Sequence, residues 1–520
     1  MSEADHRKAE KRSTVLTAAD RSPTRRCFFV GVLVLAWAGG LARSSPARAD
    51  EMIRMARDLR AKYAVQLEEL AAWCDQQGLR EEAARTRAWL GVRDPNKLYI
   101  VELPESVGPA ALPDGAAAGA VDWHKRFVQL RHQQAVVLEA LARKAVRADR
   151  ASLAFDLVLA AVREDPDYEK VRRLLGFKKQ SDSWRTLYEI DRLQAKQVWH
   201  DKYGWIAKAN LRRYDEGERL YQGRWISAEE DARLHRDVRS GWDVETEHYT
   251  IRTNHSLEAG VALGAKLEQL YRVWKQLFIR YFASEAQVRE LFDGRPRKRI
   301  QLPRHRVVYF RDKDDYVRAL KPEFANIELS IGIYIDAPRC AYFFAGEGHD
   351  ERTLYHEATH QLFHESRPVP PEVGQRANFW IIEGIAMYME SLHREEGFHV
   401  LGGFKDVRVQ AARHRLLKED FYVPLQQFSG MGMHAIQNDK RIVQLYGQAA
   451  ALTHFLIHYD GGRYRDALVA YLSDVYSGRD HPQTLPQRTG VSFTDLDAQF
   501  RQFMTSGGES PGEKKKPAGP

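Results

Sequence analysis

The chain has 520 residues, enough for two to four domains with their own cores. Its 44% hydrophobic and 29% charged residues are typical of a soluble globular protein rather than a disordered one. The formal charge is +8, but the first 49 residues hold nine Lys/Arg against four Asp/Glu, which leaves +3 for the remainder. We therefore expect no nucleic-acid partner.

Residues 1–49 predict an export signal. Arg25 and Arg26 give a twin-arginine start, residues 28–42 form an apolar run, and Ala47-Arg48-Ala49 is a small-x-small cleavage site. The run is shorter than the roughly 20 residues of a transmembrane helix. We expect a periplasmic or extracellular protein. A general secretory route and an uncleaved anchor are the alternatives.

The region after the signal is expected to be mainly helical. Residues 50–100 show helical apolar spacing, residues 101–122 are rich in Ala, Gly and Pro and predict a linker, and helices resume in residues 123–243. Cys74 and Cys340 lack zinc-site spacing. They are interpreted as buried thiols, with a single disulfide as the alternative.

Two tryptophan units recur within residues 176–243. Trp184 and Trp225 each stand two residues before a helix-capping pattern, Thr186/Glu189 and Ser227/Glu230. The first interpretation is that each Trp packs its own short strand–helix unit. The second is an aromatic platform for a ligand such as a polysaccharide, which would associate the protein with the cell envelope.

Residues 244–505 predict a second region that mixes strands with helices. Strands are expected at 248–253, 306–310, 331–335 and 340–344, and helices at 257–282 and 312–320. Helices are expected to continue to about residue 503, and residues 506–520 predict a disordered tail. The fold class is therefore α+β and helix-rich, with a small mixed sheet.

The motif His-Glu-Ala-Thr-His at 356–360 carries the chemistry. On a helix, His356 and His360 lie about 6 Å apart along the axis, on one face. Two imidazoles so placed can hold one Zn²⁺, and Glu357 can take a proton from the attacking water. His364 is about 12 Å along the axis from His356, too far to share the ion.

Glu383 is the expected third ligand. It lies in an apolar helical run, residues 379–389, where burying an unpaired carboxylate would be costly. A metal ion is one way to offset that cost, and a carboxylate that reaches solvent is the alternative.

Together these residues resemble the gluzincin metallopeptidases, specifically the aminopeptidase-like branch with H-E-x-x-H and a later E-G-x-A. The matching residues are His356, Glu357, His360, Glu383, Gly384 and Ala386. The resemblance covers roughly residues 244–505 and extends to a group of exported bacterial proteins with gluzincin-like domains. It implies that Tyr446 stabilises the oxyanion. It also implies that the strand just before the metal helix, residues 340–344, lines the cleft and can pair with an extended substrate. The branch's G-A-M-E-N-like strand is absent.

The expected function is that of an exported zinc peptidase acting on peptide or protein substrates. Zn²⁺ would be held by His356, His360 and Glu383, with Glu357 as general base. Two alternatives stay open: an inactive peptidase-like binding module, and a cell-envelope interaction protein. The sequence gives no indication of the oligomeric state.

Overall fold

The computed structural model describes residues 46–103, 112, 115–294, 303–346 and 350–507, with side chains from residue 51 onward. The α+β, helix-rich class is confirmed, since helices predominate and the strands form small sheets. The expected export signal up to residue 45 and the expected tail from residue 508 lie outside the described residues. None of the helices in these ranges has the length and apolar character that a membrane span requires.

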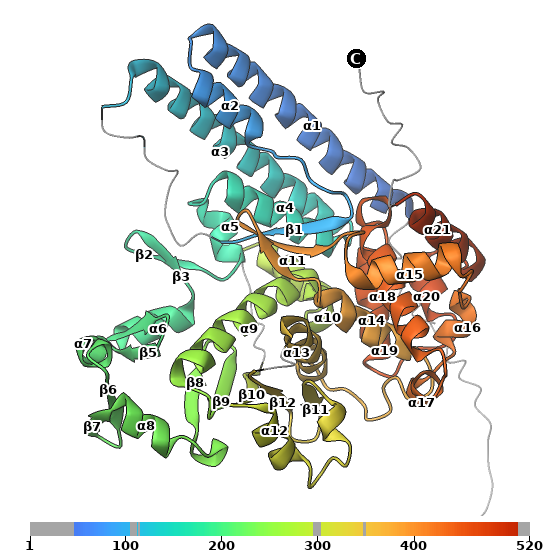
Figure 1. The fold of residues 1–520 in the computed structure, drawn as a ribbon. Helices are drawn as coiled ribbons and strands as arrows, with labels where there is room; N and C mark the ends of the chain where they lie inside the picture. The colour runs from blue at the N-terminus through green and yellow to red at the C-terminus, as the bar shows by residue number, and fades with distance from the viewer. Residues whose placement is uncertain (1–45, 104–111, 113–114, 295–302, 347–349, 508–520) are drawn as a thin grey trace, which may run out of the picture. The chain divides into compact units, whose positions relative to one another are not determined.

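Five helices form the first part of the chain (Figure 1). Glu164 ties three of them together, because its carboxylate accepts hydrogen bonds from Tyr63 Oη and Trp89 Nε1, both at 2.8 Å. The third helix begins at Ala118, inside the segment expected as a linker. The helices are α1 (Pro46–Gln76), α2 (Arg80–Ala88), α3 (Ala118–Arg147), α4 (Ala151–Glu164) and α5 (Glu169–Leu174).

Three β-hairpins, each followed by a helix, occupy residues 178–234, where two tryptophan units were recognised in the sequence. The first is β2 (Lys178–Gln180), β3 (Ser183–Arg185) and α6 (Leu187–Gln194). The second is β4 (Gln197–His200), β5 (Gly204–Ala207), η1 (Lys208–Asn210) and α7 (Leu211–Asp215). The third is β6 (Glu218–Tyr221), β7 (Arg224–Ser227) and α8 (Ala228–Leu234), with η2 (Val238–Ser240) after it.

The tryptophans of these units serve packing. Trp184 is 2% exposed and its indole N–H donates to Asp167 at 2.8 Å, so it cannot meet a ligand. In the next two units the tryptophan lies against a tyrosine from the preceding helix, edge to face with ring centroids 6.0 Å apart: Tyr188–Trp205 and Tyr214–Trp225. The contacts favour the packing interpretation over the ligand platform.

A five-stranded mixed sheet follows, in the order β11-β12-β10-β9-β8. Its three inner strands are parallel, and the two outer strands run antiparallel to their neighbours. The strands are β8 (Trp242–Glu245), β9 (Tyr249–Thr253), β10 (His305–Phe310), β11 (Ile333–Ile335) and β12 (Cys340–Phe344). The helical elements between them are α9 (Leu257–Leu277), α10 (Ile279–Phe282), α11 (Glu285–Phe292), α12 (Lys313–Leu320) and η3 (Ile327–Leu329). The strands and helices expected here are confirmed.

The expectation that residues 340–344 can pair with an extended substrate is wrong. They form β12, which has neighbours on both sides, whereas β11 is the edge strand. The reason is local: the chain makes a hairpin through Arg339, at φ 51°, and β11 therefore covers the outer side of β12. The edge nearest the metal helix belongs to residues 333–335.

The C-terminal helices build the largest apolar core together with α9 and the sheet. Figure 1 shows α13 above the strands with α14 beside it, and α14 in turn packs against α18. These helices are α13 (Glu351–Glu365), α14 (Phe379–Met389), α15 (Val407–Lys418), α16 (Leu425–Ser429), α17 (Met433–Gln437), α18 (Ile442–Gly462), α19 (Arg465–Val475), α20 (Thr484–Thr489) and α21 (Phe493–Thr505).

The N-terminal segment contributes a strand to this C-terminal region. β1 (Lys97–Val101) pairs antiparallel with β14 (Phe398–Gly402), which in turn pairs with β13 (His393–Glu395). Lys97 Nζ lies 2.9 Å from a Glu395 carboxylate oxygen and reinforces the pairing. Cys74 and Cys340 are both buried and free, as the first interpretation of the cysteines predicted.

Candidate metal centre

Helix α13 presents a polar face to the site. The helix starts at Asp350, whose side chain accepts a hydrogen bond from the Arg352 N–H. Its apolar residues face the core, with Leu354, Ala358 and Leu362 fully buried. The adjacent face of the helix is half-buried and carries His356, Glu357, His360 and His364.

Helix α14 holds Glu383 deep in the protein. Glu383 is half-buried, while the other ten residues of the helix are buried. Gly384 allows α14 to pack closely on α18, since a Cβ at this position would lie 2.4 Å from Thr453 Oγ1 and 2.8 Å from the Ala449 carbonyl oxygen. Glu383 therefore places a carboxylate at the site, and Gly384, which has no side chain, lets the backbone of α14 lie directly against α18.

The three predicted ligands come together. His356 and His360 bring their Nε2 atoms to 3.1 Å from each other, and the Glu383 carboxylate oxygens lie 3.5 Å and 3.8 Å from them. Two ligands of a tetrahedral zinc ion, each at about 2.1 Å, are about 3.4 Å apart. The three side chains thus have the donor types and the spacing that zinc requires. Within the described ranges they are the one group of this kind.

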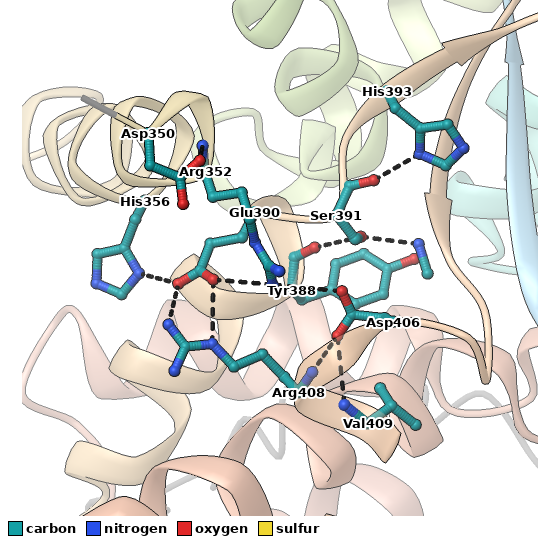
Figure 2. A network of polar contacts seen from close by, with 11 residues as sticks. Asp350, Arg352, His356, Tyr388, Glu390, Ser391, His393, Asp406, Arg408 and Val409 are labelled. Atoms are coloured by element: carbon teal, nitrogen blue, oxygen red, sulfur yellow. Dashed lines mark hydrogen bonds and ion pairs between the residues drawn. The ribbon is translucent and has the colours of Figure 1, made fainter. Parts of the chain in front are cut away.

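Glu390 orients the first histidine (Figure 2). Its Oε1 atom lies 2.9 Å from His356 Nδ1, and Arg408 holds both carboxylate oxygens at 3.1 Å. Arg352 adds a third contact at 3.2 Å and also reaches Asp406 at 3.4 Å. Because Glu390 is a buried acceptor, His356 carries a proton on Nδ1, and its Nε2 atom faces Glu383 and His360.

The surroundings of the two histidines shift their pKa values in opposite directions. Burial disfavours a charge on His356, but hydrogen bonds with the Glu383 and Glu390 carboxylates outweigh it and raise the pKa of His356 to about 10. Burial lowers the pKa of His360 to about 3. Burial alone would raise the pKa of Glu383, but the His356 hydrogen bond and the charges of His360, His356 and Arg408 together hold it below its ordinary value.

Glu357 stands beside the ligands and contacts the edge strand. Its Oε2 atom accepts a hydrogen bond from the Tyr334 backbone N–H at 2.9 Å. That N–H points away from β12, so the free edge of β11 faces the site. Burial raises the pKa of Glu357 to about 7, although the charge of His356 opposes the increase. A carboxylate with such a pKa is suited to proton transfer near neutral pH.

Tyr446 lies half-buried in the first turns of α18. Burial raises its pKa, and the charges of Glu383 and Glu357 raise it further. His364 stands apart from the three ligands: its Nδ1 atom lies 3.6 Å from Asp336. This position agrees with the expectation that His364 is not a ligand.

Sequence reasoning did not assign a role to Glu390, Arg352, Arg408 or Asp406. A signal was present for Glu390: it lies seven residues after Glu383, two turns further along the same side of a helix. The two arginines and Asp406 carry no such signal, since they reach Glu390 only through the packing of α13 and α15.

A family model described as a protein of unknown function (DUF1570) matches residues 350–479. The match spans 130 of the 520 residues and includes the three candidate ligands, Glu357 and Tyr446. No curated protein matches the chain.

Proposed function

We propose that the protein is a zinc-dependent peptidase. The convergence of His356, His360 and Glu383 supports this function most, because the donors have tetrahedral spacing and Glu357 lies next to them. A bound zinc ion supplies a Lewis acid for the scissile carbonyl and lowers the pKa of an adjacent water toward about 7. The resemblance to gluzincin metallopeptidases supports the same activity.

The chain's own residues supply binding and proton transfer. The outer edge of β11 is not paired with another strand in the parts of the chain that the structure describes, and an extended peptide can add to it by taking the place of Glu357 at the Tyr334 N–H. Glu357 takes the proton of the attacking water and delivers it to the leaving amine. Tyr446 donates a hydrogen bond to the oxyanion, a contact typically worth about 3 kcal/mol.

Export is part of the proposal and rests on residues 1–49. In this proposal the protein acts in the periplasm or outside the cell, on peptide or protein substrates. The sequence features that support it are the paired arginines, the apolar run and the cleavage site.

The test measures metal content and hydrolysis separately. Purified protein should contain one zinc per chain and cleave members of a broad peptide library. Glu357→Gln should keep the zinc and lose cleavage. His360→Ala should lose the zinc, whereas His364→Ala, one turn further along α13, should retain it. Equal activity in the wild type and Glu357→Gln would exclude this base. Zinc without any turnover would favour a binding module.

A further inference from the structure

Tyr476 has a buried hydroxyl without a partner next to the candidate metal centre. It directly follows α19, and its side chain is 0% exposed. Within the described part of the chain, its Oη atom makes no hydrogen bond. Burying a hydroxyl group without a hydrogen-bond partner costs free energy of folding, so such groups often have a functional role.

The ring of Tyr476 lies on the metal helix. It stacks on Phe363, with centroids 5.2 Å apart and planes 20° apart, and meets His364 edge to face at 5.4 Å. Helical side chains lean toward the N-terminus of their helix. A ring that packs on Phe363 and His364 therefore lies at the level of the preceding turn, which carries His360.

Glu383 is the acceptor that this arrangement offers. It pairs with the two imidazoles, and among the described residues no hydroxyl or amide donates to it. The Glu383 carboxylate lies 3.8 Å from His360, in the turn over which the Tyr476 ring lies. Burial raises the pKa of Tyr476, and the Glu383 charge raises it further. A carboxylate that ligates a metal ordinarily has a hydrogen bond on its second oxygen.

We infer that Tyr476 is a positioning residue for Glu383. When the ion is held, the Tyr476 hydroxyl donates to the Glu383 oxygen that does not face the ion, and so fixes the orientation of this ligand. The inference rests on the proposed function. It assigns the Tyr476 hydroxyl an influence on metal affinity that a tyrosine serving only the core would not have.

The neighbouring Tyr281 provides a matched control. Its ring also packs on Phe363, with centroids 4.7 Å apart, and it is 3% exposed. Its hydroxyl, however, donates to the Phe363 carbonyl oxygen at 2.6 Å and is therefore already paired. Tyr281→Phe and Tyr476→Phe remove the same atom from the same aromatic cluster, but only one of the two hydroxyls is free to serve Glu383.

The experiment compares the zinc affinity of these two variants with that of the wild type, by competition with a chelator. Tyr476→Phe should bind zinc about 10–100-fold more weakly, as is usual when a partner of a ligand is removed. Its zinc-free form should melt no lower than the wild type, because Phe keeps the ring and removes an unpaired hydroxyl. Tyr281→Phe should melt lower and bind zinc within about twofold of the wild type.

The outcomes separate this inference from the proposed function. Zinc affinity of Tyr476→Phe within about twofold of the wild type would overturn the positioning role, while the three ligands would stand. Equal loss in both variants would assign the effect to the aromatic cluster and likewise overturn it. A wild-type protein that binds no zinc would instead refute the proposed function itself.

Discussion

Replacing Glu390 by Gln tests whether the Glu390 carboxylate orients His356, one of the three candidate metal ligands. The carboxylate receives donors on both oxygens: His356 Nδ1 and Arg408 Nη2 on Oε1, and Arg352 Nη2 and Arg408 Nε on Oε2. An amide of the same shape has a single acceptor oxygen. In either orientation its NH₂ group faces N–H donors, so the variant must release either His356 or the arginines.

The expected loss follows from that conflict. Removing the partner of a metal-bound histidine typically lowers metal affinity about 10–100-fold, which corresponds to about 1.4–2.7 kcal/mol. The fold itself should lose about 1–3 kcal/mol, the usual cost of unpairing a buried polar group. Glu390 is 6% exposed, so solvent cannot replace its partners.

The assay separates these two losses. Chelator competition measures zinc affinity, and urea unfolding of the zinc-free protein measures stability. Glu164→Gln is the matched control, because Glu164 is also 6% exposed and accepts hydrogen bonds from Tyr63 and Trp89, away from the ligands. It should lose stability and keep zinc affinity. A Glu390→Gln protein that binds zinc as tightly as the wild type would refute the orienting role of Glu390.

Four further predictions concern the whole fold. Chelating the metal should lower the melting temperature, since zinc at 100 times its Kd stabilises by about 2.7 kcal/mol; an unchanged melting curve would argue against a bound ion. Burial lowers the pKa of His454 to about 3 and that of His458 well below its ordinary range, so the unfolded chain takes up more protons and stability should fall as the pH drops below about 6.5. Urea midpoints at pH 7, 6 and 5 should show this decline, and His454→Leu should flatten it. Trp184→Ala should destabilise by about 3–5 kcal/mol in urea unfolding and Trp225→Ala by less, because Trp184 is 2% exposed and Trp225 is half-buried; equal losses would contradict the burial argument. Deleting residues 46–101 should leave an insoluble product, because β1 and its pairing with β14 are removed; a soluble protein that still binds zinc would show that the strand is dispensable.

The shared face of His356 and His360 was predictable because helix geometry is nearly independent of context. Two histidines four residues apart must share a helix face, and the sequence around His356 and His360 has the spacing of a helix. Glu383 was predictable for an energetic reason, since an acid inside a run of buried apolar residues needs a counter-charge. Both inferences need only local sequence.

The remaining features depend on contacts between distant segments. Lys97 of β1 and Glu395 of β13 are 298 residues apart, and nothing in either segment indicates its partner. The order of the parallel strands is equally hidden, because nothing in the three segments indicates that β10 lies between β9 and β12. The helical segment after the Trp205 strand had no sequence signal for a local reason: it follows Ala207, which has no side-chain cap.

The charges linked to the site supply an argument for a divalent ion that does not depend on the motif. The buried and half-buried charged groups next to the two imidazoles, or joined to them by hydrogen bonds and ion pairs, are the carboxylates of Glu357, Glu383, Glu390 and Asp406 and the guanidinium groups of Arg352 and Arg408. Two arginines neutralise two of these four acids. Burying the other two carboxylates without a counter-charge would be costly. Without an ion, a proton on His356, whose pKa is about 10, and a proton on Glu357, whose pKa is about 7, balance them, and one divalent cation carries the charge of these two protons. The acids that the arginines do not contact are Glu357 and Glu383, the two on the side of the site where the Nε2 atoms converge. The charge balance and the donor geometry therefore point to the same place.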